Sequence, residues 1–296
     1  MTIRRKAISS FASRPRTTSS SWSVRVVAPP GEVVAAVEVA LSEESCSALR
    51  AMLTEGGRVY ATLNALREHG LLYRLVPEFA GLHCLVQFEF YHRWTADVHT
   101  LRCLRELDRI YAGESLVEQK YREVVLGSEA PSLLYAILFL HDIAKSGGIE
   151  GHAERGVPIA DRILERLGFD AREREIASGV IRHHLVMGLY WQRHDIDDPA
   201  NIERFARLMG DEQVLRSLFV HTRCDARATS PDLWTEFKDG QHWSLYRRTL
   251  DKLAGEAEHV VGVGRRLGGG RGGDGGHQEK PPSTRRGRGG AIRKRR

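Results

Sequence analysis

The sequence predicts an all-α fold, and three observations support a helical bundle. Apolar residues recur every three to four positions between residues 94 and 107, which places them on one face of a helix. The same spacing returns in five later segments separated by Gly, Pro or Asp, at residues 153–167, 171–186, 199–209, 211–228 and 231–253. No segment shows the alternation of apolar and polar residues that is typical of a half-buried strand.

Two shorter helices are expected earlier, within a small N-terminal helical segment at residues 31–86. Ser42 is placed to cap a helix that continues to about Leu53. A second helix is expected at about residues 58–69, where Gly70 ends it.

The two termini differ in composition from the body of the chain. Residues 1–30 contain six Lys or Arg and no acidic residue, and residues 264–296 contain eleven Lys or Arg, two acidic residues and eleven glycines. We expect a disordered leader at residues 1–30 and a disordered Gly/Arg-rich tail at residues 256–296, because neither can bury a core. The composition of the leader is similar to that of a mitochondrial transit peptide, and that of the tail is similar to an RGG-type RNA-binding segment. For both segments we favour a solvated chain end without such a function.

The net charge of +6 comes from these termini. Residues 31–263 contain 27 Lys or Arg against 36 Asp or Glu, so the body is acidic and nucleic-acid binding by it is not expected. The longest apolar run, residues 133–140, is far short of the roughly 20 residues that a membrane span needs. The four cysteines form no C-x-x-C pair, which argues against disulfides and a thiolate zinc site and favours the cytoplasm.

Two carboxylates are expected inside the helical core. His141 and Asp142 directly follow the apolar run 133–140, so the pair lies at the end of a buried helix. Asp225 falls on the apolar face of its own helix. A carboxylate in such a place is costly to bury unless it is paired or binds a metal.

Several imidazoles accompany these carboxylates on successive predicted helices. Imidazole and carboxylate together suit Mn, Fe, Mg or Zn in a hydrolytic site. Each histidine taken alone could be a core residue or a surface cap, and it is the ordered series that favours a metal cage. Its members are His99, His141, Asp142, His152, His183, His184 and Asp225.

This series resembles the HD-domain superfamily of metal-dependent phosphohydrolases, which are all-helical. Longer stretches resemble the HD domain of bacterial PII uridylyltransferase/uridylyl-removing enzymes over roughly residues 58–253. They include VPEF (76–79), QFEFYHRWTADVHTL (87–101), FLHDIAK (139–145), GHAERG (151–156), HLVM (184–187), QRHDIDDP (192–199), RFA (204–206) and DARATSPDLWTEFK (225–238). The resemblance implies an HD-type bundle at residues 87–255.

The resemblance also implies roles for individual residues. Six match the family's metal ligands: His99, His141, Asp142, His152, His184 and Asp225. Asp142 is expected to bridge two divalent ions (Mn, Mg, Fe or Zn), with His99, His141 and Asp225 on one and His152 and His184 on the other. His183 is an alternative to His184 as a ligand. Lys145 and Arg227 are expected to act with Asp142 in catalysis by stabilising the charge of the phosphate, and the alternative for either is a surface cation.

The sequence departs from the family pattern at several points. Gly151 stands where the family has Asp, and His221 and Arg223 replace apolar residues before Asp225. His221 is expected to be half-exposed, with an extra metal ligand or a substrate contact as the alternatives. No Gly-Ser followed by Asp-x-Asp, as in a nucleotidyltransferase, precedes the HD region and no ACT-like sequence follows it, so uridylyl transfer and glutamine sensing are not expected of this chain.

Three functions are compatible with these residues. The resemblance implies hydrolysis of the UMP–tyrosine diester on a PII-type signalling protein, in nitrogen regulation. One alternative is a stand-alone HD nucleotide phosphohydrolase, because substrate choice depends on pocket shape. The other is a truncated, non-catalytic HD fragment that binds a nucleotide or a partner.

Overall fold

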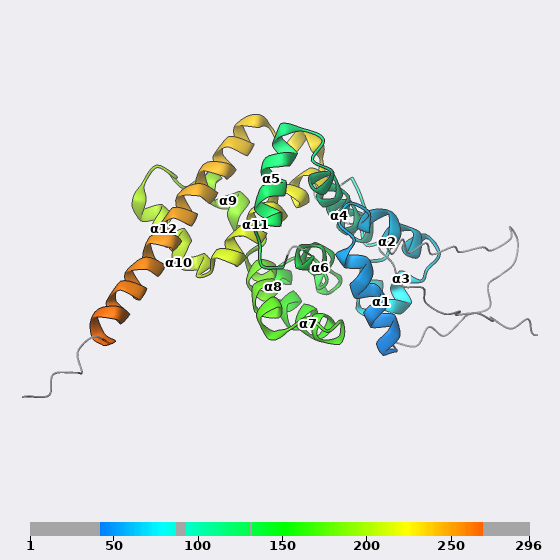
Figure 1. The fold of residues 1–296 in the computed structure, drawn as a ribbon. Helices are drawn as coiled ribbons and strands as arrows, with labels where there is room; N and C mark the ends of the chain where they lie inside the picture. Colours follow the sequence, from blue (N-terminus) through cyan, green and yellow to red (C-terminus); the bar gives the residue numbers. More distant parts are fainter. Residues whose placement is uncertain (1–41, 87–92, 131, 269–296) are drawn as a thin grey trace, which may run out of the picture. The chain divides into compact units, whose positions relative to one another are not determined.

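The computed structural model describes residues 42–86, 93–130 and 132–268, with side chains to residue 255. Within these ranges the chain is helical and contains no strand (Figure 1), so the predicted all-α fold is confirmed. The α-helices are α1 (Glu43–Thr54), α2 (Val59–Glu68), α3 (Leu72–Leu75), α4 (Ala96–Ala112), α5 (Leu116–Leu126), α6 (Leu133–Leu140), α7 (His152–Arg166), α8 (Ala171–His183), α9 (Val186–Arg193), α10 (Pro199–Met209), α11 (Glu212–Thr229) and α12 (Glu236–Gly268). Short 3-10 helices are η1 (Pro77–Leu82), η2 (Lys145–Gly147) and η3 (Pro231–Leu233).

The first two helices begin and end where the sequence predicts. The Ser42 hydroxyl accepts a hydrogen bond from the backbone N–H of Ser45 at 3.2 Å, which satisfies a donor that the first turn of α1 leaves open. Gly57 follows α1 with a φ of +89°, a conformation that a residue with a Cβ adopts only under strain. The prediction of two helices in this region is therefore confirmed.

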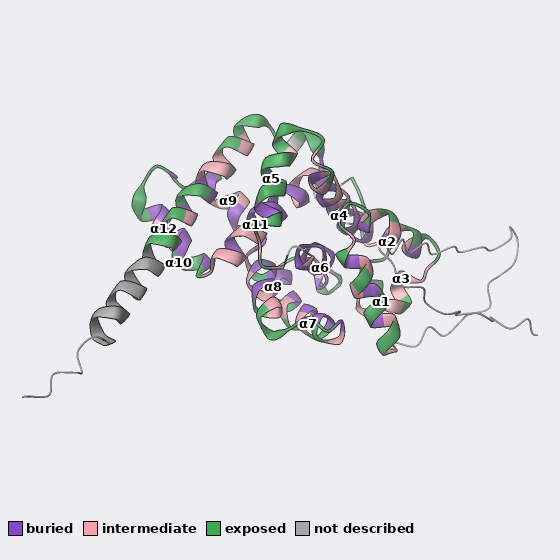
Figure 2. Cartoon of the chain, in the orientation of Figure 1, coloured by how far each residue is buried: buried purple, intermediate pink, exposed green. Residues whose placement is uncertain are grey.

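Helix α6 lies at the centre of the core. All eight of its residues are buried, and Figure 2 shows the helix in the colour of buried residues. It contacts α1, α4, α8 and α11. A helix that is apolar on every side must be enclosed by others, and α6 therefore carries the residues that follow it into the interior.

Helices α4 and α11 pack against each other over much of their length. Their apolar faces are buried, with Leu104 and Leu218 fully enclosed. On the far side of α11, Phe219 stacks on Tyr121 of α5 with ring centroids 4.7 Å apart. This packing fixes the polar residues on the inner faces of α4 and α11 opposite the end of α6.

Three details differ from the sequence-based expectation. The helix expected at residues 171–186 ends earlier, at His183, and the short helix α9 that begins at Val186 was not anticipated. Helix α5 was not anticipated, although Ser115 and Glu118 form a capping box at its start. Helix α12 continues to Gly268, so the boundary expected after residue 255 falls inside a helix.

The expected leader at residues 1–30 and most of the expected tail lie outside the described residues. None of the helices in the described part of the chain combines the length and the apolar character that crossing a bilayer requires.

Candidate metal centre

The six predicted metal ligands are brought together from five helices. His99 comes from the first turns of α4, His141 and Asp142 from the end of α6, His152 from the start of α7, His184 from the turn after α8, and Asp225 from α11. All of them are buried except Asp225, whose side chain is 24% exposed. Residues up to 126 positions apart in the sequence therefore meet at one point.

Asp142 occupies the middle of this cluster. Its Oδ2 lies 3.1 Å from His141 Nε2 and 2.7 Å from Lys145 Nζ. Its Oδ1 lies 3.2 Å from His152 Nε2 and 3.7 Å from His184 Nε2. The two oxygens of one carboxylate thus face two different sets of nitrogen atoms.

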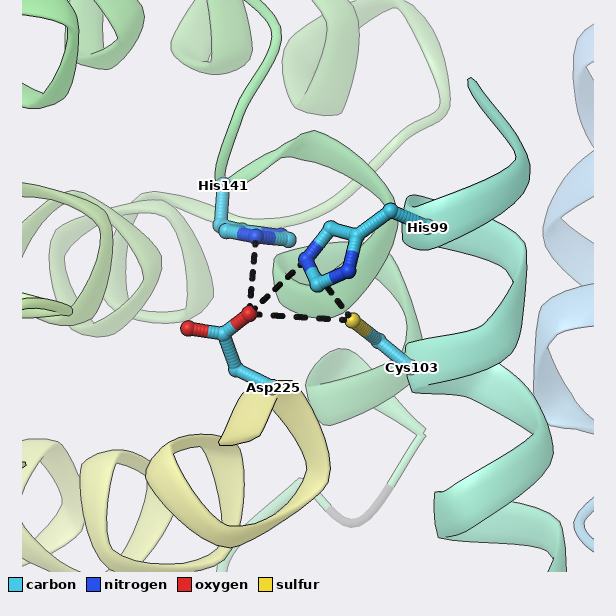
Figure 3. A group of neighbouring side chains, drawn as sticks. All are labelled: His99, Cys103, His141 and Asp225. Carbon is cyan, nitrogen blue, oxygen red and sulfur yellow. Dashed lines mark hydrogen bonds and ion pairs between the residues drawn. The ribbon is translucent and has the colours of Figure 1, made fainter. Parts of the chain in front are cut away.

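A second carboxylate completes the other side of the cluster. Asp225 Oδ1 lies 2.8 Å from His99 Nε2 and 3.8 Å from His141 Nε2. Figure 3 shows these side chains directed toward one another, together with the thiol of Cys103. The potential ligand atoms form two groups, each with all members within 4.8 Å: His99, Cys103, His141 and Asp225 in one, and Asp142, His152 and His184 in the other.

Three of the imidazoles are oriented by the backbone. In each, Nδ1 donates a hydrogen bond to the carbonyl oxygen three residues earlier: His141 to Leu138 at 2.8 Å, His152 to Ile149 at 2.6 Å and His184 to Ile181 at 2.7 Å. With the proton on Nδ1, the lone pair of Nε2 points into the cluster. This arrangement is typical of histidines that bind metals.

The protonation states also suit ligands. Burial acts to raise the pKa of Asp142, but the neighbouring His141 and Lys145 outweigh it and hold that pKa well below its usual value. Burial likewise opposes ionisation of Asp225, whose pKa is nevertheless lowered by a hydrogen bond from His99. Burial lowers the pKa of His184 to about 4, so its imidazole is neutral at pH 7. Burial lowers the pKa of His141, but the charge of Asp142 outweighs this and raises it, so this imidazole would release a proton when a cation binds. Ionised carboxylates and neutral imidazoles are the forms that bind cations.

The residues fit a divalent cation. Both oxygens of Asp142 and Nε2 of His141 are buried and make no hydrogen bond of good geometry among the described residues, although His141, Lys145 and His152 lie within ion-pair distance of the carboxylate. Buried polar atoms without partners are rare in folded proteins because each costs desolvation energy. An ion bound between them would satisfy these atoms, and their nitrogen and oxygen donors suit borderline and hard cations.

Comparison with known families agrees with this chemistry. Residues 97–218 match the family model described as HD domain. The chain contains an HD domain. The predicted relationship to metal-dependent phosphohydrolases of this family is therefore confirmed.

The chain is also similar in sequence to curated proteins named bifunctional uridylyltransferase/uridylyl-removing enzyme. That of Caulobacter vibrioides (strain NA1000 / CB15N) is 33% identical over 207 residues, which are 70% of this chain and 22% of the relative. That of Methylococcus capsulatus is 34% identical over 225 residues, 73% of this chain and 26% of the relative. That of Phenylobacterium zucineum is 35% identical over 200 residues, which are 67% of this chain and 21% of the relative. The chain thus spans about a fifth to a quarter of the length of these relatives.

The other predicted residues of the HD domain have different surroundings. Lys145, in η2, lies beside Asp142 and lines the same pocket. Arg227 instead donates a 2.8 Å hydrogen bond to Glu106 and is absent from the pocket lining. His184 belongs to the ligand groups and His183 does not.

Two further residues lie at the cluster: His221, which the sequence offered only as an alternative ligand or substrate contact, and Cys103, which was not predicted. The expectation that His221 is half-exposed is wrong, because its side chain is 0% exposed and its ring centroid lies 4.9 Å from that of His141. Cys103 was set aside because it belongs to no C-x-x-C pair, yet its Sγ lies 3.6 Å from His99 Nε2. The signal for Cys103 was its position four residues after His99, on the same face of α4.

A pocket opens onto one side of the HD-domain cluster. Its volume is about 180 Å³, and its lining consists of Asp142, Lys145, Ile149, His152, His184, Leu185, Asp225 and Thr229. Ile149 and Leu185 are 46% and 48% exposed and give the pocket an apolar rim. Solvent and substrate therefore approach from the side of Asp142, His152 and His184.

Proposed function

We propose that this HD domain hydrolyses a phosphodiester with the help of two divalent cations, and that its substrate is a uridylylated PII-type signalling protein. The observation that carries the proposal is Asp142, whose two oxygens face separate groups of ligand atoms at the base of an open pocket. The names of the relatives, which include uridylyl removal, support the choice of substrate.

The residues of the chain have distinct roles in this proposal. His99, His141 and Asp225 hold one cation, His152 and His184 hold the other, and Asp142 joins the two. Such a pair supplies Lewis acidity toward phosphoryl oxygens and lowers the pKa of water. Lys145, fixed by Asp142 at 2.7 Å, presents a positive charge at the pocket wall and stabilises the negative charge that develops on the phosphoryl group.

The pocket favours a diester that a protein presents over a free nucleotide. Sites that enclose a whole small ligand usually have about 300–1,000 Å³. The cavity of about 180 Å³ has room for the phosphoryl group and its immediate neighbours. The exposed Ile149 and Leu185 offer apolar surface to the remainder of a macromolecular substrate.

The proposal includes a role in nitrogen signalling and a cytoplasmic location. The four cysteines, Cys46, Cys84, Cys103 and Cys224, are all free, which supports a reducing compartment.

The test compares substrates and variants. The purified protein with Mn²⁺ is expected to release UMP from uridylylated PII protein, more efficiently than it hydrolyses free nucleotides. Asp142→Ala should abolish this release, whereas Asp251→Ala, which removes an exposed carboxylate from α12, should leave it unchanged. Circular dichroism checks that both variants are folded.

Three outcomes would overturn the proposal. Full activity of Asp142→Ala would contradict the site. Faster hydrolysis of free nucleotides would favour a nucleotide phosphohydrolase. Tight binding of uridylylated PII without hydrolysis, with metal bound, would favour a non-catalytic module.

A further inference from the structure

The thiol of Cys103 lies among the ligand atoms at the closed side of the cluster. Helix α4 places Cys103 one turn after His99, so the two side chains point the same way (Figure 3). Its Sγ is 3.6 Å from His99 Nε2 and 4.0 Å from Asp225 Oδ1, and the residue is fully buried. Potential metal-ligand atoms at these distances can surround one metal ion.

The distances match ligands of one ion. Around tetrahedral zinc, bonds of about 2.0–2.3 Å place nitrogen, oxygen and sulfur donors roughly 3.3–3.6 Å apart. The two distances from the Cys103 sulfur are close to this range, as is the 3.8 Å between His141 Nε2 and Asp225 Oδ1. The 2.8 Å between His99 and Asp225 is shorter, at hydrogen-bond length.

An independent observation points to a ligand at the same place. His141 Nε2 is buried, faces this group, and has no hydrogen-bond partner among the described residues. Its Nδ1 is already used by the Leu138 carbonyl, so Nε2 is left as an acceptor directed at the group. A cation there would satisfy this buried nitrogen atom.

We propose that Cys103 is a ligand of the cation held by His99, His141 and Asp225, and that this subsite therefore prefers zinc or another thiophilic divalent ion. The inference rests on the metal centre of the proposed function. As the metal–sulfur bond forms, the thiol gives up its proton to solvent. The other group, Asp142, His152 and His184, contains only nitrogen and oxygen donors and suits Mn²⁺ or Mg²⁺.

The two subsites then have different roles, one in structure and one in binding the substrate. With Cys103 beside His99, His141 and Asp225, and with Asp142 shared between the two cations, five protein ligands would leave little open coordination at the Cys103 subsite. All three residues of the second group, Asp142, His152 and His184, line the pocket, whereas Asp225 is the one member of the Cys103 group that does so and Cys103, His99 and His141 do not. The ion in the first subsite consequently holds α4, α6 and α11 together and stabilises the negative charge of Asp142. The substrate contacts the ion in the second subsite.

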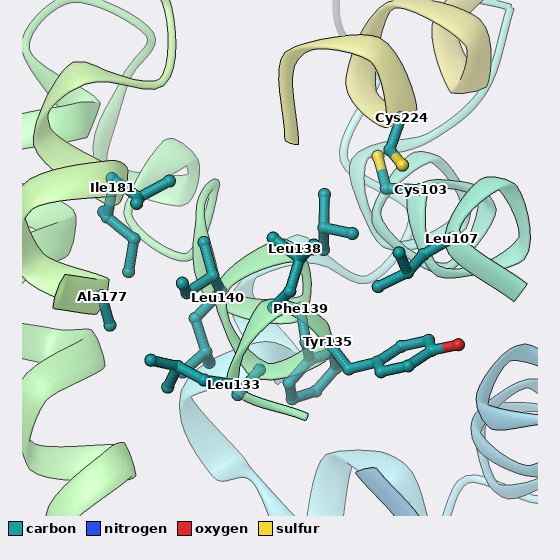
Figure 4. Close-up of a cluster of buried hydrophobic side chains, with 14 of the residues drawn as sticks. Cys103, Leu107, Leu133, Tyr135, Leu138, Phe139, Leu140, Ala177, Ile181 and Cys224 are labelled. Carbon is teal, nitrogen blue, oxygen red and sulfur yellow. The ribbon is translucent and has the colours of Figure 1, made fainter. Parts of the chain in front are cut away.

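Cobalt provides a direct test. Protein stripped of metal and titrated with two equivalents of Co²⁺ should develop the near-ultraviolet charge-transfer absorption of a cobalt–thiolate bond. Cys103→Ser should lose this absorption. Cys224→Ser is the matched control, because Cys224 belongs to the same buried cluster (Figure 4) but not to the ligand groups, and it should retain the absorption.

Zinc affinity gives a second measurement. In competition with a chromophoric chelator, Cys103→Ser should bind zinc at least about tenfold more weakly, since loss of a residue that merely supports a ligand already costs about 10–100-fold. Cys224→Ser should bind it as the wild type does.

The outcomes separate this inference from the proposed function. Wild-type protein that binds Co²⁺ without the charge-transfer absorption would overturn the inference, with no variant needed. So would absorption that persists in Cys103→Ser. If Co²⁺-loaded protein hydrolyses uridylylated PII but lacks this absorption, the proposed function stands and the inference about Cys103 fails. If the protein shows the absorption but does not hydrolyse uridylylated PII, the inference stands and the proposed function fails.

Discussion

The guanidinium of Arg227 donates a 2.8 Å hydrogen bond to the carboxylate of Glu106, joining α11 to α4 just beyond the metal centre. Glu106 is almost fully buried, and its other oxygen accepts from Arg109 at 2.8 Å. A buried carboxylate is tolerated when charged donors compensate it. Arg227 therefore stabilises the pair of helices that carries His99 and Asp225, rather than facing the pocket.

This position predicts a structural effect for Arg227→Ala. Glu106 would keep Arg109 but lose one charged donor, so the free energy of unfolding should fall by about 1–3 kcal/mol. Urea titration followed by circular dichroism measures the change. UMP release per folded molecule should fall by less than about tenfold, and a loss of several hundredfold with unchanged stability would instead make Arg227 a phosphate contact.

Lys145 should behave in the opposite way. Lys145→Met removes the positive charge at the pocket wall and keeps most of the apolar stem. Loss of one group that stabilises transition-state charge typically lowers kcat by about 10²–10³-fold. Steady-state kinetics with uridylylated PII would reveal this drop. Urea titration of the metal-loaded protein, in which the cations compensate Asp142, should show little change in stability. The half-buried Lys252 of α12 is not in the pocket lining, and Lys252→Met serves as the control. An active Lys145→Met enzyme would remove Lys145 from the proposal.

The stability of the metal-free protein should depend on pH through His242. Burial lowers the pKa of this residue to about 4, while Nε2 donates to the Phe219 carbonyl at 2.8 Å. In the unfolded chain the imidazole binds its proton near the ordinary histidine pKa of 6.5, so stability is complete above that pH and is lost as the pH falls toward 4. His242 alone should account for about 3 kcal/mol between pH 7 and pH 4.

His242→Gln isolates this contribution. Glutamine can donate to the same carbonyl but does not titrate, so the loss of stability between pH 7 and pH 4 should be smaller by that amount in urea titrations with chelator present. His69→Gln, at an exposed position after α2, is the control and should follow the wild type. Identical pH profiles for wild type and His242→Gln would contradict the assignment.

The sequence predicted those features that local pattern determines. The cap at Ser42 and the apolar run of α6 are properties of short segments, and so is the placement of His141 and Asp142 at a buried helix end. The six metal ligands were predicted with the help of the family resemblance, because their spacing alone does not show which side chains meet.

Other features depend on tertiary packing. Helix α11 is enclosed by α4, α6 and α8, which buries His221 although polar residues on a helix are usually exposed. The partner of Arg227 lies 121 residues away, and Cys103 joins the site only because α4 lies opposite α11. No local signal distinguishes a cationic residue that meets a buried carboxylate from one that meets a phosphate.

The apolar rim predicts how a protein substrate is distinguished from a small one. Ile149 and Leu185 are exposed at the mouth of the pocket, while the catalytic groups lie below them. Replacing both with Ser should raise KM for uridylylated PII about tenfold, because each loses apolar contact worth about 0.5–1 kcal/mol. Hydrolysis of methyl p-nitrophenyl phosphate, a small diester with a single aromatic ring, should lose much less of its kcat/KM. Leu208→Ser, at an exposed position of α10 outside the pocket lining, is the control. Equal losses on both substrates would mean that the rim shapes the pocket itself and does not dock a protein.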